Sequence, residues 1–281
     1  MSTYERYDKV AAHYDGSRVP IGAEIIAASL AAHAESLAKP LAEVELLDAG
    51  CGTGAYSAAL AGRVGRITAV DLSQGMLAIA RAKLALAARD GRAVLRHGSI
   101  TALPLPDAGF DAVMFNQVLH HLEDGGDPAY GGHARALAEA HRVLRPGGLA
   151  VVNVCTHAQL TRGFWYYDLI PAARAAVLRR CVPAARLEAI LAETGFVLRD
   201  RIVPHAEAMQ GRAYLRADGP LDPDWRRGDS IWALATPAEL AAAEARVRAL
   251  AESGGLEAYV AAQDAGRAEV GQFSFFVAAK A

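Results

Sequence analysis

Short apolar runs alternate with longer segments of helical periodicity along most of the chain. Two of these runs, 110–116 and 149–155, are almost continuously hydrophobic, which is typical of strands buried on both faces of a parallel sheet. The segment 73–88 instead repeats apolar residues at the spacing of an amphipathic helix. The alternation predicts an α/β protein with strands at 44–47, 66–70, 93–97, 110–116, 149–155, 195–203 and 273–279.

The spacing of the last two predicted strands indicates an insertion. About 70 residues separate the strand at 195–203 from the strand at 273–279, which is too many for a hairpin loop. We expect residues 204–271, with a helix at 237–252, to form a helical lid that recognises the substrate. A peripheral dimerisation element is the alternative. The predicted domains are 1–203 together with 272–281, and the inserted segment 204–271.

The first predicted strand ends in a turn that carries three glycines. Asp48 follows the strand, and Gly50, Gly52 and Gly54 occupy alternate positions before helix-forming residues resume. A strand, a tight glycine turn and a helix bring backbone amides close to a ligand at the helix N-terminus. The dinucleotide-binding fingerprint is one interpretation, because Gly50, Gly52 and Ala55 satisfy its spacing. The aspartate and the third glycine do not belong to that fingerprint.

The same turn contains Asp-x-Gly-x-Gly-x-Gly at residues 48–54, which resembles the first motif of the class I S-adenosylmethionine-dependent methyltransferases. Later motifs of that family are matched in the same order by Asp71, by Asn-Gln-Val-Leu-His-His at 116–121 and by Arg-Val-Leu-Arg-Pro-Gly-Gly at 142–148. The resemblance is continuous over about 4–155, and it is nearest to a bacterial group related to quinone and small-molecule methyltransferases.

The resemblance implies a Rossmann-like fold with a seven-stranded, mostly parallel sheet, helices on both faces, an antiparallel last strand and a helical lid inserted before it. It also implies S-adenosyl-L-methionine as the cofactor. The Gly50–Gly54 turn would hold the methionine portion, and Asp48 would lie near its amino group. Leu72, Ser99 and Ile100 would surround the adenine. The full set of implied cofactor-binding residues is Tyr14, Arg18, Asp48, Gly50, Cys51, Gly52, Gly54, Asp71, Leu72, Met76, Ser99, Ile100 and Asn116.

The position of Asp71 in the sequence also supports a role in binding the cofactor. It ends the second predicted strand 17 positions after Gly54, close to the distance at which an acidic residue accepts hydrogen bonds from the ribose hydroxyls. A helix N-cap is the alternative role of Asp71, although Ser73 is the better cap. Ser99 departs from the family, which usually has an acidic residue there, so its contact with the adenine amino group would be weaker.

Two pairs of residues are candidates for covering the cofactor and for catalysis. Tyr14 and Arg18 precede the first strand, and Arg18 is suited to pair with the cofactor's carboxylate; simple packing is the alternative. His120 and His121 follow the fourth strand, at the sheet edge where ligands bind. Either histidine is a candidate general base for a proton on the acceptor, and helix capping with packing is the alternative.

Aromatic residues in the second half of the chain are candidates for enclosing the acceptor. Methyl transfer from a sulfonium is an in-line displacement, which requires collinear groups and a dry site and needs no metal. An aromatic wall stabilises the dispersed positive charge of such a transition state. The predicted substrate-binding residues are Trp165, Tyr166, Tyr167 and Trp232.

Composition narrows the possible partners. The formal net charge of −2 gives no reason to expect binding to nucleic acid or to an anionic membrane.

No run approaches the ~20 apolar residues of a membrane span, and the first ten residues lack the apolar core of a signal peptide. Cys51, Cys155 and Cys181 are odd in number and do not have the spacing of a metal-binding motif. We expect a cytoplasmic, bacterial protein without a metal, as a monomer or homodimer.

Three functions stay open from the sequence. The first is a methyltransferase of small-molecule biosynthesis. The second is a tRNA- or protein-modifying methyltransferase of the same fold, which the lack of net positive charge makes less favourable. The third is a nicotinamide-dependent oxidoreductase or a cofactor-binding protein without transfer activity. The sequence does not indicate which acceptor atom is methylated.

Overall fold

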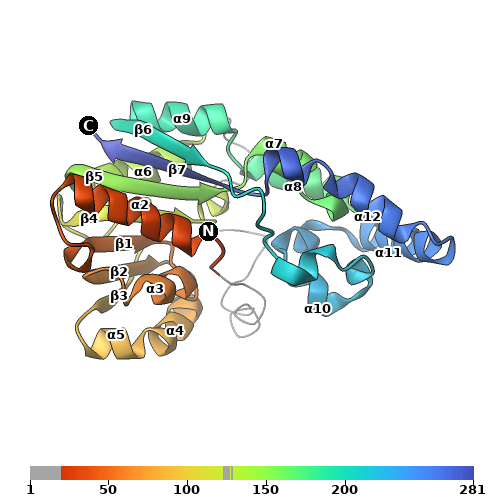
Figure 1. Ribbon diagram of the computed structural model, residues 1–281, viewed down its shortest axis with the longest axis horizontal. Helices are drawn as coiled ribbons and strands as arrows, with labels where there is room; N and C mark the ends of the chain where they lie inside the picture. The colour runs from red at the N-terminus through yellow and green to blue at the C-terminus, as the bar shows by residue number, and fades with distance from the viewer. Residues whose placement is uncertain (1–19, 123–126, 128) are drawn as a thin grey trace.

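A seven-stranded sheet forms the centre of the protein in the computed structural model, which describes residues 20–122, 127 and 129–281 (Figure 1). The strand order is β3-β2-β1-β4-β5-β7-β6. This confirms the predicted seven-stranded α/β fold. The strands are β1 (Glu45–Ala49), β2 (Arg66–Asp71), β3 (Ala93–His97), β4 (Phe110–Asn116), β5 (Leu144–Val154), β6 (Phe196–Ile202) and β7 (Ser274–Lys280).

The strand directions confirm a mostly parallel sheet with an antiparallel last strand. β1 to β5 run parallel to one another, whereas β7 is antiparallel to both β5 and β6. β6 therefore runs parallel to β5, and it ends at the same edge as the first five strands. Because the chain leaves β6 at that edge, the inserted residues 204–271 begin beside the carboxyl ends of the parallel strands.

Helices cover both faces of the sheet (Figure 1). Strand residues alternate between the two faces, so Met114 of β4 packs in the same hydrophobic cluster as Ile26, while Phe115 packs in the same cluster as Leu137. The helices and 3₁₀ helices (η) of this part are α2 (Ala23–Ser36), η1 (Leu41–Glu43), α3 (Ala55–Leu60), α4 (Gln74–Lys83), α5 (Ala85–Arg89), η2 (Leu119–His121), α6 (Gly131–Val143) and α9 (Ala184–Glu193).

A second group of helices, which we call the helical lobe, consists of residues 157–180 and 204–271 and lies beyond the carboxyl end of β5 (Figure 1). The two segments share a core, since the rings of Tyr166 and Trp225 are 5.0 Å apart between centroids. The lobe contains α7 (His157–Arg162), η3 (Trp165–Leu169), α8 (Pro171–Arg180), η4 (Gly211–Leu215), η5 (Gly219–Leu221), α10 (Pro223–Arg226), η6 (Ser230–Leu234), α11 (Pro237–Glu252), α12 (Leu256–Asp264) and α13 (Arg267–Val270).

One local prediction was wrong. The single helix expected over 73–88 is interrupted at Leu84 (φ −95°, ψ 10°), where the side chain packs with Ala93 of β3 in a small buried cluster. Within β5, residues 145–148 form an irregularity in the pairing with β4, and Gly147 takes φ +75° there.

Candidate cofactor and acceptor site

The three glycines of the first turn take left-handed backbone angles, with φ of +80°, +52° and +76° at Gly50, Gly52 and Gly54. A Cβ at Gly50 would lie 2.4 Å from a methyl carbon of Val118, so this glycine is required by packing. A Cβ at Gly52 would meet no atom within 4 Å. The backbone at Gly52 therefore borders open space at the carboxyl edge of the sheet, where a ligand can approach it closely.

Asp71 connects the end of β2 to this turn. Its Oδ2 accepts a hydrogen bond of 2.8 Å from the Gly52 amide, and its Oδ1 accepts one of 2.8 Å from the Ser73 amide. Burial raises the pKa of this carboxyl group, while the backbone amides oppose that shift. The cap of α4 is Ser73, whose side chain accepts from the Met76 amide. The N-cap role is thus taken by the serine, and ribose binding by Asp71 stays a prediction.

Asp48 is buried under the turn with only 1% of its surface exposed. Its Oδ2 accepts a hydrogen bond of 2.6 Å from Ser57 Oγ, and its Oδ1 has no partner among the described residues. Burial raises the pKa of this carboxyl group to about 7, and the neighbouring charge of Asp71 adds to the shift. A buried carboxylate with a vacant acceptor fits a cationic group such as the amino group of methionine.

The end of β4 presents a second unpartnered polar group. Both amide atoms of Asn116 are buried without a hydrogen-bond partner among the described residues. Gln117 follows in the left-handed region at φ +50°, which is uncommon for a residue with a side chain. Its backbone amide donates to the Asn153 carbonyl and its side-chain amide to Asn153 Oδ1, each at 2.9 Å. These contacts hold a strained residue at the edge of the sheet.

The residues predicted around the adenine differ in exposure. Leu72 is 39% exposed beside Asp71, so it offers an apolar surface to a nucleobase, whereas Met76 and Ile100 are buried at 2% and 6% exposure. The Ser99 hydroxyl forms a 2.8 Å hydrogen bond with Thr101 Oγ1. Tyr14 and Arg18, predicted to cover the cofactor, lie outside the described residues.

A cavity of about 50 Å³ lies between the ends of β4 and β5 and the helical lobe, and we call it the acceptor cavity. Its walls include His120, whereas His121, with its ring centroid 3.9 Å from that of His120, is not part of the wall. The lining residues are Gln117, His120, Cys155, Leu160, Tyr167, Val177, Cys181, Met209, Gly228, Asp229, Ser230, Ile231 and Leu234.

The four predicted substrate-binding aromatic residues occupy two layers. Tyr167 lines the acceptor cavity. Trp165 and Tyr166 are fully buried, and the Trp165 indole donates a 2.7 Å hydrogen bond to the Tyr214 carbonyl. Trp232 stacks on Tyr166 at 5.7 Å between ring centroids. These three residues form the core behind the wall, and their contact with an acceptor stays a prediction.

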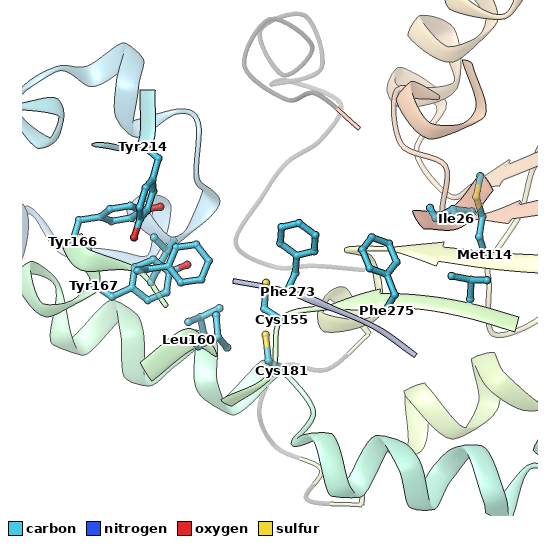
Figure 2. Close-up of a cluster of buried hydrophobic side chains, with 14 of the residues drawn as sticks. Ile26, Met114, Cys155, Leu160, Tyr166, Tyr167, Cys181, Tyr214, Phe273 and Phe275 are labelled. Atoms are coloured by element: carbon cyan, nitrogen blue, oxygen red, sulfur yellow. The ribbon is translucent and has the colours of Figure 1, made fainter. Parts of the chain in front are cut away.

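Sequence reasoning missed most of the cavity wall. Figure 2 shows Cys155 and Cys181 between the lobe tyrosines and two phenylalanines, Phe273 and Phe275, although the two cysteines are 26 positions apart in the sequence. The Cys155 thiol contacts Gln117 Oε1 at 3.5 Å and Met209 Sδ at 3.8 Å. Asp229 was also missed. No periodicity or motif marks these residues, but the polar Gln117 directly after a buried strand was a usable signal.

Comparison with known proteins bears on the predicted resemblance. A family model for a methyltransferase domain matches residues 47–152, which run from within β1 to within β5 and include Asp48 and Asp71. The match confirms the resemblance to the class I S-adenosylmethionine-dependent methyltransferases over this part of the chain. S-adenosylmethionine is the cofactor of this family, and the open backbone at Gly52 and the vacant acceptor of Asp48 fit it.

Curated relatives resemble this chain over less than half of its length. An uncharacterized methyltransferase of Mycobacterium tuberculosis is 38% identical over 130 residues, which cover 45% of this chain and 58% of that protein. Malonyl-[acyl-carrier protein] O-methyltransferase of Serratia marcescens is 39% identical over 119 residues, 41% of this chain and 40% of that protein. The match thus spans less than two thirds of each relative.

Solved structures share the fold over a larger part of the chain. A protein of Anabaena variabilis, described as a methyltransferase from an antibiotic biosynthesis pathway, has a TM-score of 0.66 at 22% identity, covering 88% of this chain and 95% of that one. The [4+2]-cyclase SpnF has a TM-score of 0.58 at 22% identity, covering 98% and 93%. At these identities the likeness concerns the fold alone.

The described residues contain neither a membrane-spanning helix nor a cluster of metal-ligating side chains. No helix in these ranges is both long enough and apolar enough to cross a membrane. No group of three or more histidine, cysteine, aspartate or glutamate side chains is arranged there to hold a metal ion.

Proposed function

We propose that this methyltransferase transfers the methyl group of S-adenosylmethionine to a small-molecule acceptor by in-line displacement. One observation carries the proposal: the open backbone at Gly52 lies beside the buried carboxylate of Asp48 and the half-buried carboxylate of Asp71, at the same edge as the acceptor cavity. The size of the cavity, about 50 Å³, supports a small acceptor or a small reactive group.

The residues that would hold the cofactor are those around the turn. Gly50 to Gly54 would hold the methionine portion, Asp48 its amino group and Asp71 the ribose, with Leu72 against the adenine. The cofactor supplies an electrophilic methyl group on a sulfonium. Asn116, whose amide is unpartnered among the described residues, is placed to bind a polar group of the cofactor. Tyr14 and Arg18 complete the proposed set as a cover.

The contribution of the lobe is to position the acceptor and exclude water. Leu160, Val177 and Ile231 make part of the cavity wall apolar, which keeps the reacting groups dry. Tyr167 and Gln117 offer hydrogen bonds that orient the acceptor. His120, also on the wall, is the proposed general base when the acceptor atom carries a proton of high pKa. Residues 204–271 act as the proposed lid.

Modification of tRNA or protein is the second candidate within the family. The net charge of −2 does not favour RNA, because phosphate contacts need a basic surface. A protein without transfer activity is a third candidate, since the [4+2]-cyclase shares the fold. Cofactor binding and methyl transfer therefore have to be measured separately.

Calorimetric titration with S-adenosylhomocysteine and, separately, with NAD tests the cofactor. We expect binding of S-adenosylhomocysteine only; binding of NAD alone would overturn the proposal. Labelled S-adenosylmethionine then tests transfer, with small-molecule extracts, bulk tRNA and protein offered as separate acceptors. We expect label in the small-molecule fraction. Label in tRNA or protein alone would favour the second candidate.

A further inference from the structure

The acceptor cavity has an acidic wall residue that the family motifs do not include. Asp229 precedes η6 and lines the cavity, and no lysine or arginine is among the described residues that line it. His120 is the only basic side chain in that described part of the wall. The charge of the wall is therefore set by a carboxylate that comes from the helical lobe.

Three donors fix the position of the Asp229 carboxylate. Its Oδ2 accepts hydrogen bonds from the hydroxyls of Tyr166 at 2.6 Å and Tyr167 at 3.0 Å, and its Oδ1 accepts one of 3.1 Å from the Ile231 amide. Burial, together with the charge of Asp229, holds the pKa of both tyrosines well above the ordinary value. The tyrosines thus remain donors and leave the negative charge on the aspartate.

Arg180 is a cation that interacts with Cys181 of the cavity wall. It acts on the Cys181 thiol and lowers its pKa, but burial has the larger effect and Asp229 adds to it, so that the pKa is raised to about 12. Arg180 does not line the cavity. An anionic acceptor in the cavity would therefore meet the carboxylate of Asp229 directly and would find no guanidinium or ammonium on the described wall.

We propose that Asp229 selects the methyl acceptor by charge, so that the cavity takes a neutral or cationic acceptor group, such as an uncharged hydroxyl or an amine, and rejects carboxylates and phosphates. The inference rests on the proposed function, because it concerns the acceptor of the same site. Two like charges in a partly enclosed cavity repel more strongly than in water, and this repulsion discriminates between ligands of equal size.

The two cysteines of the wall allow a test that needs no known acceptor. Three methanethiosulfonate reagents, carrying an ammonium, a neutral methyl or a sulfonate group, probe the cavity. The thiolate attacks the sulfenyl sulfur, a mixed disulfide forms and methanesulfinate leaves. Mass spectrometry gives the rate at Cys155 and Cys181, and each rate is divided by that of the same reagent with 2-mercaptoethanol.

In the wild-type protein we expect the normalised rate of the sulfonate reagent to be roughly tenfold below that of the neutral reagent at both cysteines. The ammonium reagent should be at least as fast as the neutral one. In Asp229→Asn this difference between the neutral and the sulfonate reagent, which we call the sulfonate penalty, should shrink to about twofold or less. Any change in the thiol pKa cancels, because all three reagents need the same thiolate.

Two controls separate the cavity from general charge effects. Cys51 lies in the glycine turn and not on the cavity wall, so its reagent ratios should not respond to Asp229→Asn. Asp218→Asn removes an exposed carboxylate of the same lobe and should leave the ratios at Cys155 and Cys181 unchanged.

Three results would overturn the inference: equal normalised rates for the three wild-type reactions, an unchanged sulfonate penalty in Asp229→Asn, or no reaction of either cysteine with the neutral reagent. If Asp229→Asn does not fold, the wild-type ratios decide alone. None of these readings requires turnover, so titration of the same preparation with S-adenosylhomocysteine tests the proposed function independently.

Discussion

Two aspartates beside the glycine turn show how the surroundings of a carboxyl group affect its protonation. Asp71 accepts from two backbone amides, whereas Asp48 accepts from one serine hydroxyl and keeps a vacant oxygen among the described residues. Burial without enough donors raises the pKa of Asp48 to about 7. A cationic ligand beside Asp48 would favour its ionised form, so cofactor binding and proton release are expected to be coupled near neutral pH.

Asp48→Asn should make the protein more stable at pH 8 and weaken cofactor binding. The pKa of Asp48 is about 7 in the folded protein and near the ordinary 3.8 in the unfolded chain. Its stabilising contribution is therefore complete below about pH 4 and is lost as the pH rises through 7. We expect a gain of about 1–3 kcal/mol in the free energy of unfolding at pH 8.

Urea titrations at pH 4 and pH 8, together with titration by S-adenosylhomocysteine, check this prediction. The gain should be small at pH 4. Asp90→Asn, at a partly exposed surface carboxylate, is the matched control and should change little at either pH. Unchanged affinity in Asp48→Asn would show that the carboxylate does not bind the methionine amino group.

Gly52→Ala separates backbone strain from loss of the ligand site. Gly52 and Gly91 both have positive φ and open space at the Cβ position, but Gly91 lies in the turn before β3, away from the glycine turn. Each alanine variant should lose about 1 kcal/mol of stability, from the strained backbone. Only Gly52→Ala should also weaken S-adenosylhomocysteine binding, by tenfold or more. Similar affinities for the two variants would contradict the proposed cofactor position.

At the scale of elements, Tyr214 of η4 joins the inserted segment to η3. Its hydroxyl donates to Asp264 at 2.6 Å and accepts from the Trp165 amide at 3.1 Å. The Tyr259 hydroxyl on α12, by contrast, is buried without a partner among the described residues. The inserted helices are thus held to η3 through a specific buried contact as well as through aromatic packing.

Tyr214→Phe should lower the free energy of unfolding by about 1–3 kcal/mol, because it leaves the Trp165 amide and the Asp264 carboxylate without this partner. Tyr259→Phe should have almost no effect, because its hydroxyl has no described partner to lose. Thermal unfolding of both variants measures the difference. Equal losses would mean that aromatic packing, rather than the hydroxyl, holds the lobe together.

At the scale of the whole molecule, Asp111 joins distant parts of the fold at the edge opposite the site. Its carboxylate pairs with Lys39 and with Arg145 of β5 at 2.7 Å, and it accepts from the Glu45 amide at 2.8 Å. Burial alone would raise the pKa of Asp111, but these three partners together hold it below the ordinary value. The stability that they supply is therefore present above about pH 4 and is lost as pH falls through the folded pKa.

Asp111→Asn should accordingly cost about 1–2 kcal/mol of stability at pH 7 and progressively less under acid conditions. Unfolding in urea at pH 7 and at pH 3 measures both values. Asp107→Asn serves as the control, since its pair with Arg142 is largely exposed and should contribute little. A loss that is independent of pH would indicate a packing defect instead of a lost ion network.

Local patterns in the sequence were enough to predict the sheet and the glycine turn at its carboxyl edge. Buried parallel strands need nearly continuous apolar runs, and the turn after β1 needs glycine. Both features are therefore visible as local sequence patterns around Asp48, Gly52 and Asp71. The order of the motifs and predicted strands also implied the resemblance to the family and the place of the inserted segment. Such features depend on neighbours within a few positions, which a linear pattern records.

The acceptor cavity could not be predicted from the sequence. Gln117, Cys181, Met209 and Asp229 meet on one wall although they come from four separate segments, and no spacing in the sequence connects them. The aromatic cluster was visible as a motif, but which ring faces the cavity and which fills the core depended on how the lobe packs. Long-range packing sets such positions, because each wall residue is placed by the element that carries it.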